Sequence, residues 1–274
     1  MPPVKPTPDL AGAVPRPASL PMYDLPRQAV QAWWQGIAGA LQAEGLAGVP
    51  GTPDWPADLP AHWLHPRLLL SQACGHPLVT TLHGQVQVVG AMRYAAPGCE
   101  GTRYCSLLVV RDGEALPAAG LQALAGWSGR VAAVNDAGSF SGGVALRRAV
   151  QSVAGLPPPA FFGRLLFTGS HRASLAAVRE GRADIAAIDA VTHALVARHQ
   201  PALLHGLQVL ARTASAPGLP LITALGTSPQ ELAVLRRALQ AACAAPHLAA
   251  ARQALLVDGF EPLGAEAWPA QALL

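Results

Sequence analysis

Hydrophobic residues recur along the chain in two patterns, one at helical spacing and the other as short uninterrupted runs. Val30, Trp33, Ile37 and Leu41 lie three or four residues apart and predict a helix that begins at Pro26. Short apolar runs that end in glycine or small polar residues predict strands. On this ground strands are expected over 18–24, 67–77, 86–94, 104–111, 129–135, 161–170, 183–189, 207–213 and 219–225.

Helices are expected between and after these strands. Ser228 and Glu231 have the spacing of a capping box, with Pro229 at the first helical position. The proline-rich residues 51–66 are expected to form a loop, and the residues after the Ser228 helix to be helical and then irregular. The other helices are expected at 121–125, after Gly143, from the N-cap Ser170 to Gly181, and at 190–199. This alternation predicts an α/β fold with mostly parallel sheets.

The order of these elements predicts two lobes, because one segment reads as an insertion into another domain. The chain is expected to cross between the lobes twice, with hinges near 96–104 and 206–217. The first lobe would contain residues 1–96 and 214–274, and the second lobe residues 97–213. Two lobes joined by two crossing strands leave a cleft between them.

Composition removes several classes of partner. The chain has 274 residues, of which 51% are hydrophobic and 13% are charged, and its formal net charge is +3. No cluster of basic residues is present, so nucleic acid is not an expected partner. No run of about 20 apolar residues predicts a membrane span. The N-terminus lacks the pattern of a signal peptide, so the chain as written is expected in the cytoplasm. A longer natural start, or another export route, would place it in the periplasm.

The cysteines and histidines give no metal signature. Cys74, Cys99, Cys105 and Cys243 do not form the close pairs of a zinc site, and no histidine belongs to a His-Glu-x-x-His motif. No metal and no cofactor are therefore expected. Buried free thiols and a disulfide between Cys74 and Cys99 both stay open, because geometry decides between them.

Three predicted strand-to-helix turns carry hydroxyls, amides or glycine, namely 71–75, 135–143 and 168–171. The free N–H groups and the dipole of a helix N-terminus favour an anion there. In the second turn glycines such as Gly142 allow a close backbone approach, and Ser139 and Ser141 add donors. His171, in the first turn of its helix, can donate to an oxyanion. Together the turns predict a cleft that binds a small oxyanion.

Catalytic readings of the second turn fit less well. A nucleophile elbow needs serine between its glycines, but Phe140 occupies the central position of residues 138–142. A nucleotide-binding loop needs a lysine, and Lys5 is the only lysine in the chain. The tyrosines Tyr23 and Tyr104 are placed to reach a cleft. Asp189, at the end of a strand, reads as a helix cap or as an acceptor for a protonated or amino-bearing ligand.

Several segments resemble one protein family in order along the chain. They include SLPMYDLP, LLLSQACGHPL, YAAPGCEGTRYCSLLVVR, GRVAAVNDAGSFSG, FTGSHRASLAAVREGRADIAAIDAVT and APGLPLITA, between residues 19 and 225. The chain resembles the phosphate, phosphite and phosphonate substrate-binding proteins of ABC transporters. That resemblance implies the fold of type II periplasmic binding proteins, in which two α/β lobes close on a ligand, and no enzymatic activity.

The resemblance also implies a ligand set and partners. Ser139, Ser141 and His171 would hold phosphonyl or phosphate oxygens, and Asp189 would meet the other end of the ligand. An ABC permease is the implied partner of a monomeric binding protein. The alternatives are an enzyme of the same fold that acts on a phosphorylated or carboxylated metabolite, and a cytosolic ligand sensor. The full expected ligand-binding set is Tyr23, Gln72, Tyr104, Ser139, Phe140, Ser141, Gly142, His171 and Asp189.

Overall fold

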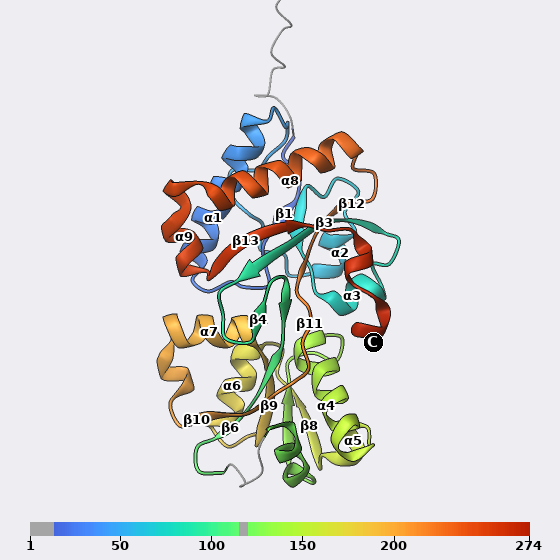
Figure 1. Cartoon of the computed structure of the whole chain (residues 1–274), viewed down its shortest axis with the longest axis vertical. Helices are drawn as coiled ribbons and strands as arrows, with labels where there is room; N and C mark the ends of the chain where they lie inside the picture. Colours follow the sequence, from blue (N-terminus) through green and yellow to red (C-terminus); the bar gives the residue numbers. More distant parts are fainter. Residues whose placement is uncertain (1–13, 115–119) are drawn as a thin grey trace, which may run out of the picture.

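The computed structural model describes residues 14–114 and 120–274 and shows two α/β lobes stacked along one long axis (Figure 1). Lys5 lies outside the described residues. Each lobe is built around a five-stranded sheet. The first sheet contains, in spatial order, β1 (Ala18–Ser19), β2 (Leu70–Gln72), β12 (Pro220–Ala224), β3 (Val86–Tyr94) and β13 (Val257–Pro262).

The second sheet lies in the other lobe and mixes two strand directions. Its order is β10 (Leu207–Arg212), β6 (Ser106–Arg111), β9 (Ile185–Asp189), β7 (Val131–Val134) and β8 (Arg164–Phe167). β7 is parallel to both β8 and β9, whereas β6 is antiparallel to its two neighbours. The parallel strands therefore end at the same edge of the sheet.

The expectation of mostly parallel sheets is wrong for the first lobe. There β12 runs antiparallel to β2 and β3, and β13 runs antiparallel to β3. The cause is the insertion of the second lobe between β3 and β12, because the returning chain enters the first sheet in the opposite direction. Parallel pairs need a crossover connection. Within the described part of the chain, the first sheet has one parallel pair, β1 with β2, and the second sheet has two, β7 with β8 and β7 with β9.

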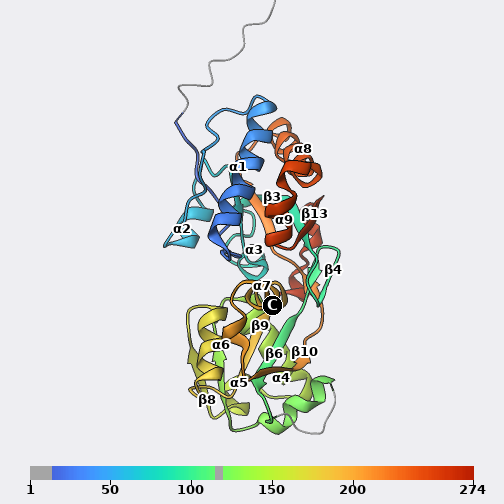
Figure 2. The ribbon, with the colours of Figure 1, turned by 90° about the vertical axis from the view of Figure 1, so that its left-hand side faces the viewer.

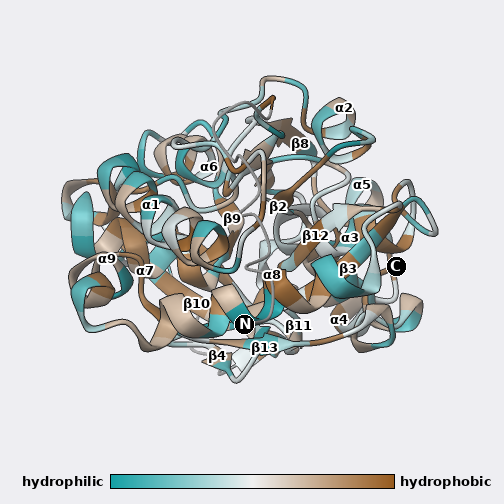
Figure 3. Cartoon of the chain, turned by 90° about the horizontal axis from the view of Figure 1, so that it is seen from above, coloured by the Kyte–Doolittle hydropathy of each residue, from teal (hydrophilic) through white to brown (hydrophobic). Residues whose placement is uncertain are grey.

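One face of the first sheet is covered by α1 (Arg27–Ala43), α8 (Pro229–Ala244) and α9 (Ala249–Ala254) (Figure 1). Trp33, Ile37 and Leu41 of α1 are buried in one core with Leu235 and Leu239 of α8. This confirms the helix expected after Pro26. Figure 3 shows that α1 carries both hydrophilic and hydrophobic residues, as expected of a helix that is buried on one face.

The second sheet has a core on each face. Leu108 and Val110 of β6 pack on the side of α4 (Ala145–Ala154) and the 3₁₀ helix η2 (Gly120–Trp127), with α5 (Pro158–Phe161) beside them. Leu107 and Val109 of the same strand face α6 (His171–Arg179) and α7 (Ala190–His199). A strand buried on both faces reads as the continuous apolar run that predicted it.

The lobes are joined through a small sheet at the waist of the molecule. β4 (Cys99–Glu100) and β5 (Arg103–Tyr104) pair antiparallel, and β5 also pairs with β11 (Ala216–Pro217). Figure 2 shows β4 at the level where the two lobes meet. We propose that residues 96–104 and 206–217, which include these strands, are the hinges between a first lobe of 1–96 and 214–274 and a second of 97–213.

Three segments differ from the sequence expectation. The 51–66 segment contains α2 (Leu59–Trp63), because the Asp58 side chain accepts a hydrogen bond from the Ala61 N–H and caps a short helix. A second short helix, α3 (Gly75–Val79), follows β2. Near the C-terminus, β13 forms an edge strand where helix or irregular chain was expected. Its Gly259 and Pro262 weaken any strand signal, and edge strands tolerate both residues.

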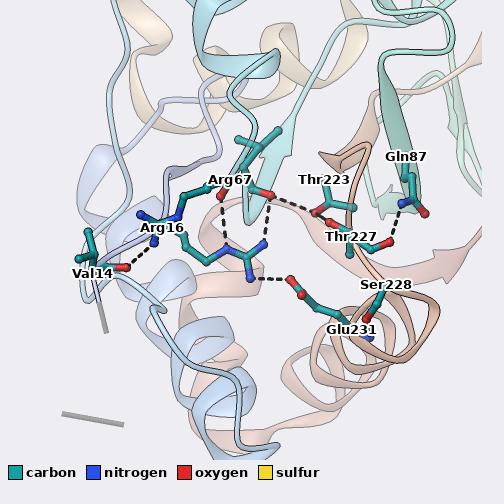
Figure 4. Close-up of polar contacts among 9 residues, drawn as sticks. Val14, Arg16, Arg67, Gln87, Thr223, Thr227, Ser228 and Glu231 are labelled. Atoms are coloured by element: carbon teal, nitrogen blue, oxygen red, sulfur yellow. Dashed lines mark hydrogen bonds and ion pairs between the residues drawn. The ribbon is translucent and has the colours of Figure 1, made fainter. Parts of the chain in front are cut away.

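The predicted capping box is half confirmed. The Ser228 Oγ accepts a hydrogen bond of 3.1 Å from the Glu231 N–H at the start of α8. The Glu231 carboxylate pairs with Arg16 instead of returning to Ser228, and Arg16 also donates to the carbonyl oxygens of Arg67 and Leu68 (Figure 4). Helix α8 is thereby tied to the N-terminal segment. All four cysteines are free thiols, as one of the two alternatives held, but only Cys105 is buried and the other three are partly exposed.

Candidate functional site

A cleft of about 440 Å³ lies between the two lobes. The second lobe contributes the strand-to-helix turns after β7, β8 and β9, and the first lobe contributes a facing wall. Of the predicted ligand-binding residues, those that line the cleft are Tyr23, Ser139, Ser141, His171 and Asp189. The structure therefore brings together residues that are up to 166 positions apart in the sequence.

The turn after β7 forms a hydroxyl-lined bend at a helix N-terminus. Ser139 caps a π-helical turn, η3 (Phe140–Val144), which continues into α4. The Ser139 Oγ accepts hydrogen bonds from the Asn135 Nδ2 at 3.1 Å and from the Gly142 N–H at 3.4 Å. With its oxygen held by two donors, the Ser139 hydroxyl keeps its own hydrogen for an acceptor in the cleft.

The backbone position of Gly142 leaves no room for a side chain. A Cβ built on Gly142 would lie 1.7 Å from the Asn135 Oδ1 and 3.3 Å from the His171 Cε1. Glycine at this position thus lets the helix start approach Asn135 and His171 closely.

Ser141 and His171 join two of the turns. The Ser141 Oγ lies 2.8 Å from the His171 Nε2, and the Ser141 carbonyl accepts a 2.8 Å hydrogen bond from the Ser106 hydroxyl. Burial lowers the pKa of His171 to about 4, so the imidazole is neutral at pH 7. When its proton is on Nε2, the ring donates to Ser141 and leaves the serine hydrogen free to donate to a ligand.

Asp189 caps α7 and also contacts the first lobe. Its Oδ1 accepts from the Thr192 N–H at 2.9 Å, and its Oδ2 accepts from the Tyr23 hydroxyl at 3.0 Å. Burial raises the pKa of Asp189 to about 6 and raises the pKa of Tyr23 well above its usual value. The capping role is confirmed, whereas an additional contact with a ligand stays a prediction.

Helix N-termini, and not cationic side chains, would attract an anion to the cleft. Within the described ranges, no lysine or arginine lines the cleft, and no recorded hydrogen bond uses the backbone N–H of Ser141 or His171. Both N–H groups lie in the first turn of a helix, where the dipole favours negative charge. This arrangement is suited to a small anion held by aligned donors.

The other predicted residues lie behind the cleft surface. The Gln72 Nε2 donates to the Tyr94 hydroxyl at 3.0 Å, and both residues line a separate small pocket that also contacts Tyr23. Tyr104 is buried and packs against Phe140, with 6.1 Å between their ring centroids. Phe140 and Gly142 are buried as well. These residues support the turn, and their direct contact with a ligand stays a prediction.

The first-lobe wall was missed by the sequence reading. It contains Met22, Leu59, Pro60, Trp63, Cys74, Pro77 and Leu219. Cys74 lies in the predicted 71–75 turn, although it was not placed in the ligand set. The other wall residues are apolar residues near prolines, and such residues carry no pattern that distinguishes a cleft wall from packing. Asn135 and Ser170 were noticed as turn and cap residues but were not placed in the ligand set.

Residues 73–268 match the model of one family, described as the periplasmic substrate-binding protein of phosphonate ABC transporters. The chain belongs to this family. No curated protein sequence matches the chain.

Solved structures share the fold of this phosphonate-binding family member at low identity. PhnD1 from Prochlorococcus marinus, in complex with methylphosphonate, has a TM-score of 0.74 at 14% identity, over 93% of this chain and 94% of its own. A binding protein component of an ABC phosphonate transporter from Pseudomonas aeruginosa has a TM-score of 0.73 at 15% identity, over 92% and 83%. A Xanthomonas citri protein bound to ATP has a TM-score of 0.68 at 17% identity, over 95% and 94%. The fold is that of type II periplasmic binding proteins.

The length and composition of the described helices can be compared with those of membrane-spanning helices. None of them combines the length and the apolar character that a bilayer-spanning helix needs.

Proposed function

We propose that the chain captures a phosphonate, phosphite or phosphate in the interlobe cleft and presents it to the permease of an ABC transporter. The observation that carries this proposal is the seat formed by Ser139, Ser141 and His171 at the N-termini of α4 and α6. Family membership supports the transport role. The working compartment is the periplasm named in the family description, and the working form is a monomer.

The seat suits a tetrahedral oxyanion because its donors come from two helices. Ser139, Ser141 and His171 all line the second-lobe side of the cleft, where the two hydroxyls and the Ser141 and His171 N–H groups are the available donors. Each hydrogen bond to a charged oxygen contributes about 1.5–3 kcal/mol. A bound anion also favours the imidazolium form of His171, so protonation of the ring strengthens binding.

The serine–histidine contact supports binding and not turnover. In nucleophilic catalysis the second histidine nitrogen is held by a carboxylate that orients the ring and stabilises its charge. Two carboxylates lie on this side of the cleft. Asp136 accepts from the Gly138 N–H, and Asp189 accepts from Tyr23 and Thr192. Ser141 thus lacks the oriented base of a hydrolase.

Contacts between the lobes link ligand capture to closure. Tyr23 reaches Asp189, and Asp24 pairs with Arg172 of α6 at 2.8 Å. A ligand seated on the second lobe would lie beside these contacts and add its own to the first lobe. Closure around ligand is the state that a permease distinguishes from the empty protein.

The direct test is calorimetric titration of the purified chain with methylphosphonate, phosphite and phosphate. Sulfate and acetate serve as controls for general anion binding. We expect saturable binding of at least one phosphorus oxyanion, and an unchanged ³¹P spectrum of the ligand after prolonged incubation. Binding of carboxylates alone, or conversion of the ligand, would refute the proposal.

Replacing Ser141 with alanine is expected to weaken binding of that oxyanion by about 1–3 kcal/mol, because one donor to the anion is lost. The same titration measures the effect. Ser152→Ala is the matched control, since Ser152 lies on the exposed side of α4 and bonds only the Ala149 carbonyl. Equal affinity in both variants would remove Ser141 from the site.

A further inference from the structure

The cleft is divided sharply between a polar side and an apolar side. Every second-lobe residue that lines it is polar, charged or glycine, and they come from the turns after β7, β8 and β9. The first-lobe residues and Leu219 of the crossing are apolar or aromatic, apart from the Cys74 thiol and the Tyr23 hydroxyl. A ligand that spans the cleft must therefore carry its polar group at one end and a non-polar group at the other.

The polar atoms on the first-lobe side are already bonded. The Trp63 indole is 5% exposed and donates its Nε1–H to the Gln72 carbonyl at 3.1 Å, so it presents only carbon to the cleft. The Tyr23 hydroxyl donates to Asp189. The Cys74 Sγ accepts from the Phe140 N–H at 3.4 Å, and burial raises the pKa of the thiol, which keeps it neutral. This wall offers dispersion and burial but no spare charge.

The carboxylates near the cleft do not provide an ammonium site on that wall. Asp136 and Asp189 both belong to the second lobe. Asp136 accepts from the Gly138 N–H at 2.7 Å, and each oxygen of Asp189 has a donor. Asp24, an acidic residue of the first-lobe segment next to Tyr23, is paired with Arg172.

We infer that the ligand is an organophosphonate with an apolar substituent larger than methyl, such as an alkyl chain of several carbons or an aryl ring. This inference rests on the proposed function, because the phosphonyl group occupies the serine–histidine seat. The cleft volume of about 440 Å³ leaves room for more than methylphosphonate, which has only five non-hydrogen atoms. The substituent lies against Leu59, Trp63 and Leu219, where it loses contact with water.

The test is a calorimetric series on the full chain with methyl-, ethyl-, n-butyl-, phenyl- and 2-aminoethylphosphonate, and with inorganic phosphate. We expect n-butyl- and phenylphosphonate to bind about ten-fold or more tightly than methylphosphonate. We expect 2-aminoethylphosphonate to bind about ten-fold more weakly than n-butylphosphonate, because its ammonium loses water without gaining a partner.

The outcomes separate this inference from the proposed function. If phosphate and methylphosphonate bind but the larger ligands do not, or if the aminoethyl ligand binds most tightly, the inference is overturned and the proposed function stands. If no phosphorus oxyanion binds, the proposed function fails and the inference fails with it.

A charge placed on the apolar wall gives a second readout. Leu59 is the first residue of α2, a position at which aspartate is compatible with a helix. Leu59→Asp is expected to shift the affinity ratio of 2-aminoethyl- to n-butylphosphonate at least ten-fold toward the amine. Leu59→Asn, of equal size without the charge, is the matched control. The same ratio in both variants would overturn the placement of the substituent on this wall.

Discussion

Gly142→Ala is expected to weaken phosphonate binding roughly 100-fold or more. The added Cβ would lie 1.7 Å from the Asn135 Oδ1, a separation that no pair of non-bonded atoms tolerates. Asn135 must move, and its hydrogen bond to the Ser139 hydroxyl moves with it. Calorimetric titration with methylphosphonate measures the loss.

A helical glycine elsewhere gives the matched control. Gly39 lies within α1, and a Cβ built on it meets nothing within 4 Å. Gly39→Ala is expected to leave binding unchanged and to stabilise the fold by about 0.5–1 kcal/mol. Circular dichroism of both variants separates a damaged seat from a damaged fold. A folded Gly142→Ala variant with wild-type affinity would show that the oxyanion does not bind at this turn.

The sequence predicted a helix or strand well where its hydrophobic residues repeat with a single clear period. The strand at 86–94 and the helix at 190–199 have the bounds that the hydrophobic pattern indicated. The direction of β12 was not predictable from local pattern, because it depends on where the chain re-enters the first sheet after the second lobe. Likewise β13 is specified by its pairing with β3 and not by its own residues.

The two sides of the site differed in predictability for a physical reason. On the second lobe, each site residue follows a strand and precedes a helix, and this position alone places Ser139, His171 and Asp189 at one edge of parallel strands. On the first lobe, Trp63 reaches the cleft from a short helix among prolines, and Leu219 reaches it from the link between β11 and β12. Their positions depend on tertiary packing, which leaves no sequence period.

The second large effect concerns stability, because two buried groups of the cleft titrate in opposite senses. Burial raises the pKa of Asp189 from 3.8 to about 6. Between those values the folded protein holds more protons than the unfolded chain, so the free energy of unfolding falls as pH rises. Burial lowers the pKa of His171 from 6.5 to about 4. Here the folded protein holds fewer protons, so the free energy of unfolding falls as pH decreases.

Asp189→Asn is therefore expected to stabilise the ligand-free protein by about 3 kcal/mol at pH 7 and by little at pH 3.5, where the carboxyl is mostly protonated in both states. Asparagine keeps the cap of α7 and can donate to the Tyr23 oxygen. Urea unfolding at several pH values measures the difference. His171→Gln isolates the other group and is expected to stabilise the protein near pH 4 and not at pH 7.

In the wild type, the contributions of Asp189 and His171 to the free energy of unfolding change in opposite directions between pH 4 and 6. Together they give a shallow pH dependence, and each single variant should show a steeper one. Asp189→Asn should become steadily less stable as pH falls through this window, because only His171 still titrates. A variant that gains no stability at pH 7 would mean that donors from Tyr23 and Thr192 fully offset the burial of the charge. Asp189 would then stay ionised throughout this window and would repel a phosphonate at every pH above 4.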